Sequence, residues 1–197
     1  MFKSFFTITL RSLSRQGIFS IINILGLSIG LAVVVLISLQ NFNELSFNRG
    51  FKESKNIYRI NAITGAEIYT STANAVAPAI KAEIPEVISA VRTFNREYDM
   101  MLNDNTVFIQ VIWADEDFFR LFDTPFLLGS PEDVMSRPNT IAISESEAKR
   151  LFGNDDPLGQ LLIHTIWKNT PPMEVVAVFK DYPINSSFRN YKTIDYI

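Results

Sequence analysis

Three neighbouring carboxylates form the densest group of potentially reactive side chains in this sequence. Asp115, Glu116 and Asp117 stand together in the stretch ADEDFFRLF. Clustered carboxylate oxygens can bind a hard cation such as Ca²⁺. Acids directly before an apolar helical segment also interact favourably with the positive end of a helix dipole. The pattern favours helix capping over a metal site.

His164 is the only histidine of the chain. It lies in the apolar stretch LLIHTIW, where a lone histidine is typical of a partly buried, neutral side chain rather than of a base or a metal ligand. The sequence has no G-x-x-x-x-G-K-[ST] phosphate loop, no G-x-S-x-G or H-E-x-x-H motif and no cysteine. We therefore predict no catalytic, cofactor-binding or metal site, and we expect that the chain is not an enzyme.

A long uncharged run, from residue 18 to residue 39, is the strongest structural signal in the sequence. As a helix it would span about 33 Å at about 1.5 Å per residue, enough to cross a hydrocarbon core of about 30 Å. A secretory signal has a shorter apolar region followed by small residues, whereas this run continues into SLQNF. We predict one uncleaved transmembrane helix over residues 17–44.

Small residues within this run predict close packing against other membrane helices. Gly26 and Gly30 are four residues apart, with Ser28 between them. The G-x-x-x-G spacing places small residues on adjacent turns, where a second helix can approach closely. The same spacing also arises by chance in apolar runs. Gly26, Ser28 and Gly30 are the candidate packing residues.

The residues before this run predict a helix on the membrane surface. Residues 1–16 place Lys3, Arg11 and Arg15 among phenylalanine, isoleucine and leucine at roughly helical spacing. Such a basic amphipathic segment suits the headgroups of anionic membrane lipids, although a short lead-in to the spanning helix is the alternative. Basic residues flank both ends of the run, so the positive-inside rule does not decide the orientation.

The part of the chain after the run predicts an acidic folded domain. From residue 40 onward it contains all 21 acidic side chains and has a net charge near −6. Such a surface argues against nucleic acid as a partner, and about 150 residues can bury one sizeable core. We predict an α+β fold for residues 45–197, held by a chain that crosses the membrane once.

Periodicity predicts the elements of this domain. We expect strands at residues 56–63, 87–94, 107–114, 139–144 and 173–182, a strand around His164, and a helix over residues 72–87 that begins near Ala77. Asn103, Asp104 and Asn105 predict a turn. A capping box of Ser144 and Glu147 and a stop at Gly153 predict a helix after residue 144. No element is expected beyond Phe188.

The order of several segments resembles the N-terminal part of a MacB/FtsX-type ABC transporter permease. The segments are KSFFTITLRSLSRQGIFSIINILGLSIGLA, NELSFNRGFKESKNIYRI, APAIKAEIPEV, DFFRLFDTPFLLGSPEDV, PNTIAISESEAKRLFGNDDPLGQLL and VVAVFKDYPINSSF. Each segment alone is a weak signal, but the set covers Lys3 to Phe188 in the same order. The resemblance implies a first transmembrane helix followed by most of a MacB-like periplasmic core domain.

The resemblance also implies a mechanical function without catalytic residues on this chain. Such permeases have four transmembrane helices and work as dimers, so the expected partners are a cytoplasmic ABC ATPase subunit, a second permease copy and membrane lipids. ATP hydrolysis on the ATPase would move the outer domain during export of an antimicrobial peptide, a drug or a lipoprotein. Residues 1–16 would then lie in the cytoplasm, and residues 45–197 would lie outside the inner membrane.

Two departures from the permease pattern bear on these expectations. Asn43 and the pair Phe47-Asn48 stand where many relatives have an acidic residue and a Tyr-Asp pair. The later membrane helices do not follow, so we expect an N-terminal fragment whose domain is incomplete at its C-terminal end. A single-pass, membrane-anchored binding or sensor module remains the alternative function.

Overall fold

The computed structural model describes residues 7–8, 11, 15, 17–166 and 169–196. The chain divides into two units, Met1–Phe47 and Asn48–Ile197. Most of the segment expected as an amphipathic helix lies outside the described residues, namely residues 1–6, 9–10, 12–14 and 16. The surface helix therefore stays a prediction.

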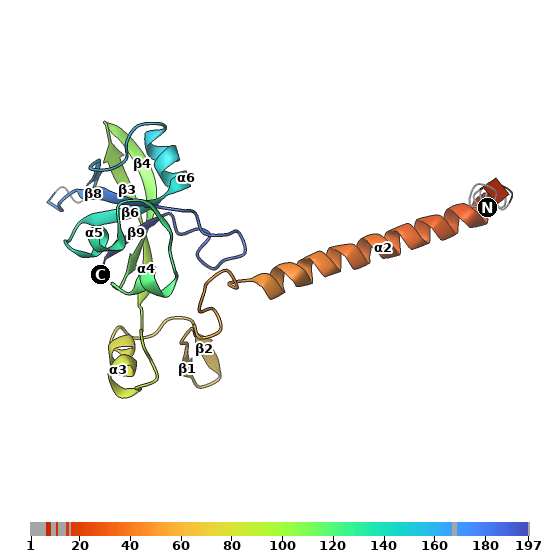
Figure 1. Ribbon diagram of the computed structural model, residues 1–197, viewed down its shortest axis with the longest axis horizontal. Coiled ribbons are helices and arrows are strands. Elements are labelled where there is room, and N and C mark those ends of the chain that lie inside the picture. Colours follow the sequence, from red (N-terminus) through yellow and green to blue (C-terminus); the bar gives the residue numbers. More distant parts are fainter. Residues whose placement is uncertain (1–6, 9–10, 12–14, 16, 167–168, 197) are drawn as a thin grey trace. The chain divides into compact units, whose positions relative to one another are not determined.

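One long helix makes up most of the described residues of the first unit. Helix α2 (Gly17–Ser46) has 30 residues, equivalent to about 45 Å at about 1.5 Å per residue (Figure 1). It contains no proline, and Glu44 is its only charged residue. Nothing in this sequence interrupts the backbone hydrogen bonds, so the helix continues beyond the uncharged run by about two turns.

A mixed sheet organises the second unit. Its order is β5-β8-β6-β9-β4-β3-β7, and β7 also pairs with β8, so six of the strands form a closed circuit (Figure 1). The strands are β3 (Thr93–Leu102), β4 (Asn105–Ala114), β5 (Phe126–Leu128), β6 (Thr140–Ser144), β7 (Leu161–His164), β8 (Met173–Phe179) and β9 (Thr193–Tyr196). The pairs β4–β9 and β6–β8 are parallel, and the other pairs are antiparallel.

Three short helices pack near this sheet, and local sequence signals define two of them. They are α4 (Phe118–Leu121), α5 (Pro131–Met135) and α6 (Glu145–Phe152). Ser130 forms a reciprocal capping box with Asp133 at the start of α5. At the start of α6 the Ser144 hydroxyl accepts the Glu147 backbone N–H as predicted, but the Glu147 carboxylate pairs with Arg150 instead of completing the box.

Two apolar clusters share the strands of the sheet. One is aliphatic and contains Met100, Leu102, Ile109, Val111, Ile141, Ile143, Leu162, Met173, Val175 and Val178. The other is largely aromatic and contains Phe51, Phe118, Phe119, Phe179 and Tyr182 together with smaller residues such as Ala142 and Ile194. Strand β6 contributes to both clusters and is buried at all five positions. Its three central residues, Ile141, Ala142 and Ile143, form an uninterrupted apolar run of the kind found in strands covered on both faces.

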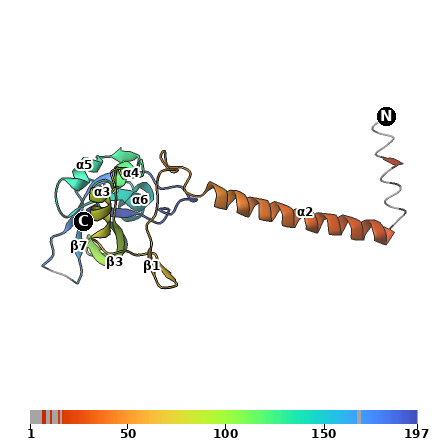
Figure 2. The same cartoon turned by 90° about the horizontal axis from the view of Figure 1, so that it is seen from below.

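A hairpin and a helix precede the main sheet in the chain. Strands β1 (Ala62–Thr64) and β2 (Glu67–Tyr69) form a separate two-stranded sheet, and α3 (Val76–Glu83) follows it (Figures 1 and 2). Pro78 lies in the first turn of α3, where no intrahelical N–H bond is lost, as predicted. The strand predicted at residues 56–63 is wrong, because only its last two residues are extended and paired.

The β3–β4 hairpin corrects a second strand prediction. The expected strand at residues 87–94 is wrong, because β3 begins at Thr93 and pairs in register with the whole of β4. The turn was predicted correctly: Asn103 and Asp104 both have left-handed φ angles, +46° and +64°. A two-residue turn of this kind matches the twist of antiparallel strands, and it thereby fixes the register of the polar strand β3.

Strand β9 overturns the expectation that no element follows Phe188. It lies between β4 and β6, parallel to the first and antiparallel to the second. Thr193, Ile194 and Asp195 are fully or almost fully buried. The sequence Thr193-Ile194-Asp195-Tyr196 does alternate polar and apolar side chains, but four residues are too few for a clear strand signal. Pairing on both edges buries both faces, including the polar one, so the neighbouring strands define this strand more than its own sequence does.

The register of β9 buries a carboxyl group in apolar surroundings. Asp195 is paired with Trp113 on β4 and Ile141 on β6. Its Oδ1 accepts the Tyr196 backbone N–H at 2.6 Å, whereas its Oδ2 has no hydrogen-bond partner among the described residues. Burial raises the pKa of Asp195 to about 7, from an ordinary value near 4.

We expect Asp195→Asn to stabilise the full chain at alkaline pH. The folded state holds the Asp195 proton up to about pH 7, so this group's contribution is complete below about pH 4 and is lost as the pH rises through about 7. The neutral, isosteric amide removes that loss. At pH 8 the gain should be at least about 1.4 kcal/mol, the equivalent of one pKa unit.

Denaturant unfolding of the full chain in detergent at pH 4, 6 and 8 measures this effect. Asp104→Asn, at an exposed turn position, is the matched control. Equal pH profiles for Asp195→Asn and the unmodified chain would contradict the burial argument.

Candidate functional site

Helix α2 is the first candidate for a functional element. Among the described residues it is the one helix that is long and apolar enough to cross a membrane, with a mean hydropathy of 2.6 over its most apolar window. Its apolar side chains are almost all exposed, and only Ser20 is buried. A 30-residue helix with apolar side chains on all sides is suited to lipid rather than to water.

The small residues of α2 leave space on one side of the helix. An added Cβ at Gly26 or Gly30 would meet no heavy atom within 4 Å, apart from the helix's own backbone and immediate neighbours. At about 100° per residue these two glycines share one face, whereas Ser28 points about 160° away from Gly30. Helix packing at Gly26 and Gly30 stays a prediction, and helix geometry separates Ser28 from that face.

The carboxylates at the end of β4 form a charged seam with three cations. Here the seam means Lys81, Ser89, Arg92, Asp115, Asp117 and Arg120. Asp115 receives two hydrogen bonds from the Arg92 guanidinium, at 2.6 Å from Nη2 and 2.9 Å from Nε, and one from the Arg92 backbone N–H at 2.8 Å. Asp117 binds the Lys81 ammonium at 3.1 Å and the Ser89 hydroxyl at 2.9 Å, and it also pairs with Arg120.

Asp115, Glu116 and Asp117 stand directly before a helix, as predicted, but the predicted capping of that helix by their side chains is wrong. Asp117 occupies the N-cap position of α4, but its carboxylate makes no capping hydrogen bond. Glu116 is exposed. Asp115 and Asp117 instead bind side chains that lie 23 to 36 residues earlier in the chain. Sequence periodicity carries no signal for such long-range ion pairs.

The seam keeps both carboxylates ionised. Partial burial raises the pKa of Asp115, but hydrogen bonds from the Arg92 side chain and backbone outweigh it and hold the pKa below its usual value. Burial likewise raises the pKa of Asp117. Hydrogen bonds from Ser89 and Lys81, together with the Arg120 charge, outweigh this effect and hold the pKa below its usual value. Carboxylates held in this way are poor proton donors at neutral pH.

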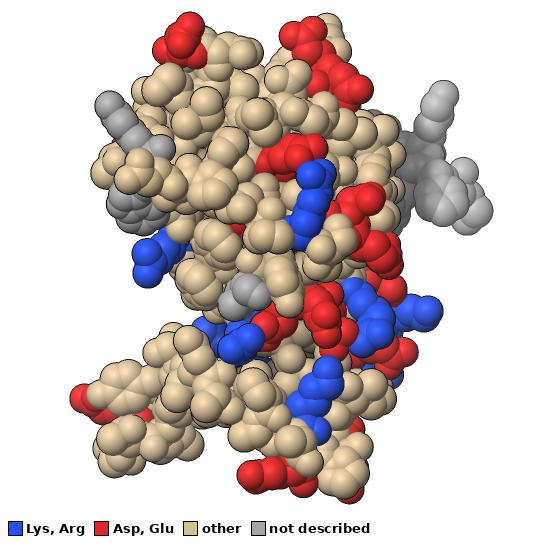
Figure 3. Space-filling view, turned by 90° about the vertical axis from the view of Figure 1, so that its left-hand side faces the viewer, with Lys and Arg blue, Asp and Glu red and all other residues tan. Residues whose placement is uncertain are grey.

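The seam attaches the α3 segment to the main sheet. Residues 52–92 contain no buried side chain, so this segment has no core of its own. Ile57 and Val91 are partly buried against the aromatic cluster, and Lys81, Ser89 and Arg92 supply polar contacts. Figure 3 shows acidic and basic side chains gathered across the middle of the face that it draws. An attachment that is largely polar and partly exposed is weaker than a packed core.

A second polar group joins the start of α6 to the segment between β8 and β9. The Ser146 hydroxyl donates to Asp181 at 2.7 Å, and the Lys192 ammonium donates to the Ser146 oxygen at 2.9 Å and also pairs with Asp181. A serine beside a lysine can act as a nucleophile, with the lysine as the general base that accepts its proton. Lys192 donates to both oxygens here, so it cannot accept the hydroxyl proton, and the group is a structural tie.

His164 lies where the sequence predicted it. It ends β7, it is 5% exposed, and its ring makes an edge contact with Tyr98 at 5.2 Å between ring centres. Burial lowers the pKa of this histidine, so it is neutral at pH 7. The prediction of a buried, neutral histidine is confirmed.

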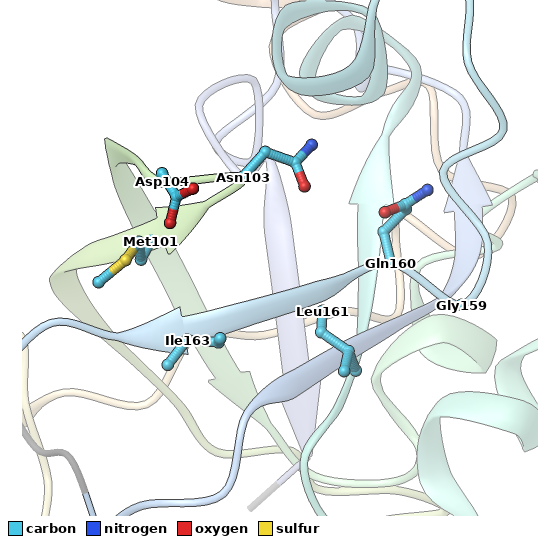
Figure 4. A pocket seen from close by; sticks show the side chains of 7 residues that line it. All are labelled: Met101, Asn103, Asp104, Gly159, Gln160, Leu161 and Ile163. Carbon is cyan, nitrogen blue, oxygen red and sulfur yellow. The ribbon is translucent and has the colours of Figure 1, made fainter.

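A shallow hollow lies between the tip of the β3–β4 hairpin and the start of β7. Its volume is about 520 Å³, and Figure 4 shows Asn103 and Asp104 on one side and Gly159 and Gln160 on the other. Met101, Leu161 and Ile163 complete the lining. Asp104 is the one ionisable side chain of this lining, so the hollow holds no pair of groups for acid–base or nucleophilic chemistry.

Comparison with known proteins identifies the family of the chain. The family model for the MacB-like periplasmic core domain matches residues 20–196. This match begins inside α2 and ends with the last residue of β9. The chain belongs to the MacB-like periplasmic core domain family.

Two solved structures are similar to this member of the MacB-like family. A domain of a protein from Porphyromonas gingivalis, assigned as a permease, is 33% identical, with a TM-score of 0.55 over 62% of this chain and 51% of that chain. The periplasmic region of MacB from Actinobacillus actinomycetemcomitans is 16% identical, with a TM-score of 0.50 over 76% of this chain and 62% of that chain. The chain thus spans about half to three fifths of these structures. No curated protein matches it.

The MacB-like family confirms the predicted fold and the family resemblance. The mixed α/β domain after an apolar helix was expected from the order of the sequence segments, and both parts fall within the family match. The family match does not by itself define the roles of single residues. The seam at Asp115 and Asp117 was missed because its partners come from a different segment of the chain.

We expect Asp117→Asn to loosen the α3 segment selectively. The substitution removes the charge that Lys81 and Arg120 share, and the loss in stability should be about 1 kcal/mol or less because the pairs are partly exposed. Amide hydrogen exchange of residues 76–83 should accelerate severalfold, while exchange in β6 stays unchanged. The full chain in detergent is measured by mass spectrometry.

Glu116→Gln is the matched control, because Glu116 is the exposed neighbour of Asp117 and lies outside the seam. Salt at 1 M should reproduce part of the Asp117→Asn effect by screening. Equal exchange of α3 in both variants would show that the seam does not hold this segment.

We expect Gly26→Leu and Gly30→Leu to impair assembly in the membrane but not insertion. Leucine fills the space beside the glycines and keeps a second helix at a distance, while the helix remains apolar enough to insert. Blue native electrophoresis of native membranes should show at least half of the complex lost. Val34→Leu is the control, and loss of insertion in both glycine variants would show that the glycines serve the helix itself.

Proposed function

We propose that this chain supplies the first membrane helix and the outer domain of an ABC-type permease. In this proposal residues 17–44 cross the inner membrane, the N-terminus lies in the cytoplasm, and residues 45–197 lie on the periplasmic or extracellular side. The chain then acts with a cytoplasmic ABC ATPase and a second permease copy. Its task is to pass ATP-driven movement to the outer domain during export of a peptide or a lipoprotein.

One observation carries this proposal. The match to the MacB-like family runs without interruption from α2 into the second unit and through its last strand. An apolar helix joined to that domain is the arrangement expected of a permease subunit rather than of a free periplasmic protein. The similar structure from Porphyromonas gingivalis, which is assigned as a permease domain, agrees with this function.

The chemistry of the described residues is compatible with a mechanical role. The two polar groups that could suggest catalysis, the charged seam and the Ser146–Asp181–Lys192 tie, both connect segments that are distant in the chain. Ionised carboxylates held by cations fix such connections without acting on a substrate. A transmitting domain needs connections of this kind, whereas an enzyme needs free reactive groups in a pocket.

Basic residues flank both ends of the apolar run, and the proposal places the N-terminal ones in the cytoplasm. Lys3, Arg11 and Arg15 precede the apolar run without any acid, and such segments are retained on the cytoplasmic side beside anionic lipids. Arg49, Lys52 and Lys55 follow the helix. In the proposal these three residues lie near the outer headgroups, and the resemblance to permeases supports this choice between two flanks of similar charge.

A labelling experiment with nucleotide tests the proposal. The chain has no cysteine, so Leu45→Cys at the end of α2 and Ser71→Cys on the domain each introduce a single, exposed thiol. The full protein is prepared from native membranes in nanodiscs, where both faces are accessible. With ATP and vanadate, the rate of maleimide labelling should change at least twofold at both positions relative to AMP.

The opposite result has a clear meaning. Labelling rates that are equal with ATP and vanadate and with AMP at both positions would contradict coupling to an ATPase. The anchored binding or sensor module would then be the better description of this chain.

A further inference from the structure

The link between the membrane helix and the domain is very short. Helix α2 ends at Ser46, and Asn48 is already hydrogen-bonded to a distant part of the domain. Phe47 is therefore the only residue between the helix and the first fixed position. One residue spans at most about 3.6 Å, so the chain offers almost no slack at this point.

Asn48 is clamped by both its backbone and its side chain. Its backbone N–H donates to the Asn185 carbonyl at 2.9 Å, and its Nδ2 donates to the Ser187 hydroxyl at 2.8 Å. In return the Ser187 backbone N–H donates to the Asn48 Oδ1 at 2.7 Å. Two segments that are 139 residues apart are thus joined by three hydrogen bonds.

The backbone conformation of Asn48 is one that asparagine adopts more readily than most residues. Its φ angle is +57°, in the left-handed region that asparagine tolerates better than most residues. An asparagine at this position therefore meets two requirements together. It adopts the left-handed backbone conformation, and it presents an amide that both donates and accepts hydrogen bonds.

Phe51, three residues later, anchors the same segment in the aromatic cluster. Its side chain is buried, and its ring makes edge contacts with Phe122 at 5.4 Å, Phe188 at 5.7 Å and Tyr182 at 6.3 Å between ring centres. Phe188 and Phe122 also contact each other at 4.3 Å. Since Phe188 follows Ser187 directly, the clamp and the cluster hold the same loop.

The clamped loop connects two internal strands of the sheet. Residues 180–192 lead from β8 to β9, and each of these strands is paired on both of its sides. Phe122 directly follows α4, and Asp117, the N-cap residue of the same helix, belongs to the charged seam. A displacement of Asn48 would therefore reach the centre of the sheet through the loop, and the α3 segment through α4 and the seam.

An ordinary juxtamembrane linker would look different. Linker residues are exposed and make local contacts, as Asn56 does with Glu53 at 2.9 Å. Asn48 and Phe51 instead make contacts with residues far away in the sequence. The distinction lies in these long-range contacts rather than in composition, because the segment around them is basic and polar.

We propose that Asn48 and Phe51 form a joint that transmits displacement of the membrane helix to the loop at residues 180–192 and so to the sheet. This inference rests on the proposed function, since it names the residues through which ATP-driven movement enters the outer domain. Asn48 and Phe51 are positioning residues in this role. They act through the loop and touch no cargo.

The test combines Asn48 variants with the two cysteine reporters, Leu45→Cys and Ser71→Cys, in the full protein in nanodiscs. Asn48→Gly keeps the left-handed backbone and the bond to the Asn185 carbonyl, but it removes both side-chain bonds to Ser187. Asn48→Asp can still accept from the Ser187 N–H and hydroxyl, so it is the conservative rescue. Asn56→Gly removes a local bond of the same kind and is the matched control.

We expect Asn48→Gly to uncouple the domain from the helix. The response of Leu45→Cys to ATP and vanadate should persist, while the response of Ser71→Cys should fall by at least half. Asn48→Asp should restore it, and Asn56→Gly should leave both responses unchanged. Unaltered amide exchange in β6 verifies that the Asn48→Gly domain is folded, and Phe51→Leu provides a second variant with the same expected result.

Failure of the inference can be distinguished from failure of the proposed function. If neither reporter responds in the protein with native Asn48, the proposed function is wrong and the joint has nothing to transmit. If both reporters respond and the Ser71→Cys response is as large in Asn48→Gly and in Phe51→Leu as in the parent, the function stands and the joint is refuted.

Discussion

The insertion of β9 between β4 and β6 is the constraint on which the rest of the domain depends. Without this strand, β5, β8 and β6 would be joined to β4, β3 and β7 only through the short pairing of β7 with β8. β9 supplies hydrogen bonds to both halves over only four residues. The partners are distant in sequence, so their pairing must overcome a large loop-closure entropy before it stabilises the fold.

The position of β9 also determines what precedes it. The loop from residue 180 to residue 192 has to return from β8 to the space between β4 and β6, and on that path it places Phe188 in the aromatic cluster and Ser187 beside Asn48. Asp181 and Lys192, at the two ends of the loop, both bind at the start of α6. The same strand buries Asp195, whose raised pKa is the electrostatic cost of this position.

Two kinds of contact divide the domain into parts of different stability. The aromatic and aliphatic clusters bury large side chains from α4, α5 and the sheet, and such contacts dominate folding energetics. The segment over residues 52–92 has no buried side chain and depends largely on the charged seam. A domain that combines a packed core with a polar attachment can move one part while the other stays folded. That property is useful for a protein proposed to transmit movement.

Local patterns predicted the elements whose sequence contains its own structural signal. The uncharged run predicted α2, Asn103 and Asp104 predicted the hairpin turn, and Ser144 with Gly153 predicted the bounds of α6. The order of the segments predicted the family. In each case the physical reason is local, because periodicity, left-handed turn residues and caps act within a few residues.

The sequence by itself therefore determined the long apolar helix, most elements of the fold and the family. Only the tertiary structure decided that residues 193–196 form a central strand. It also decided that Asp115 and Asp117 bind cations instead of capping a helix, and that Asn48 is clamped to the loop at residues 180–192. These features depend on partners that lie tens of residues or more away, and which distant segments meet is settled by the packing of the whole sheet.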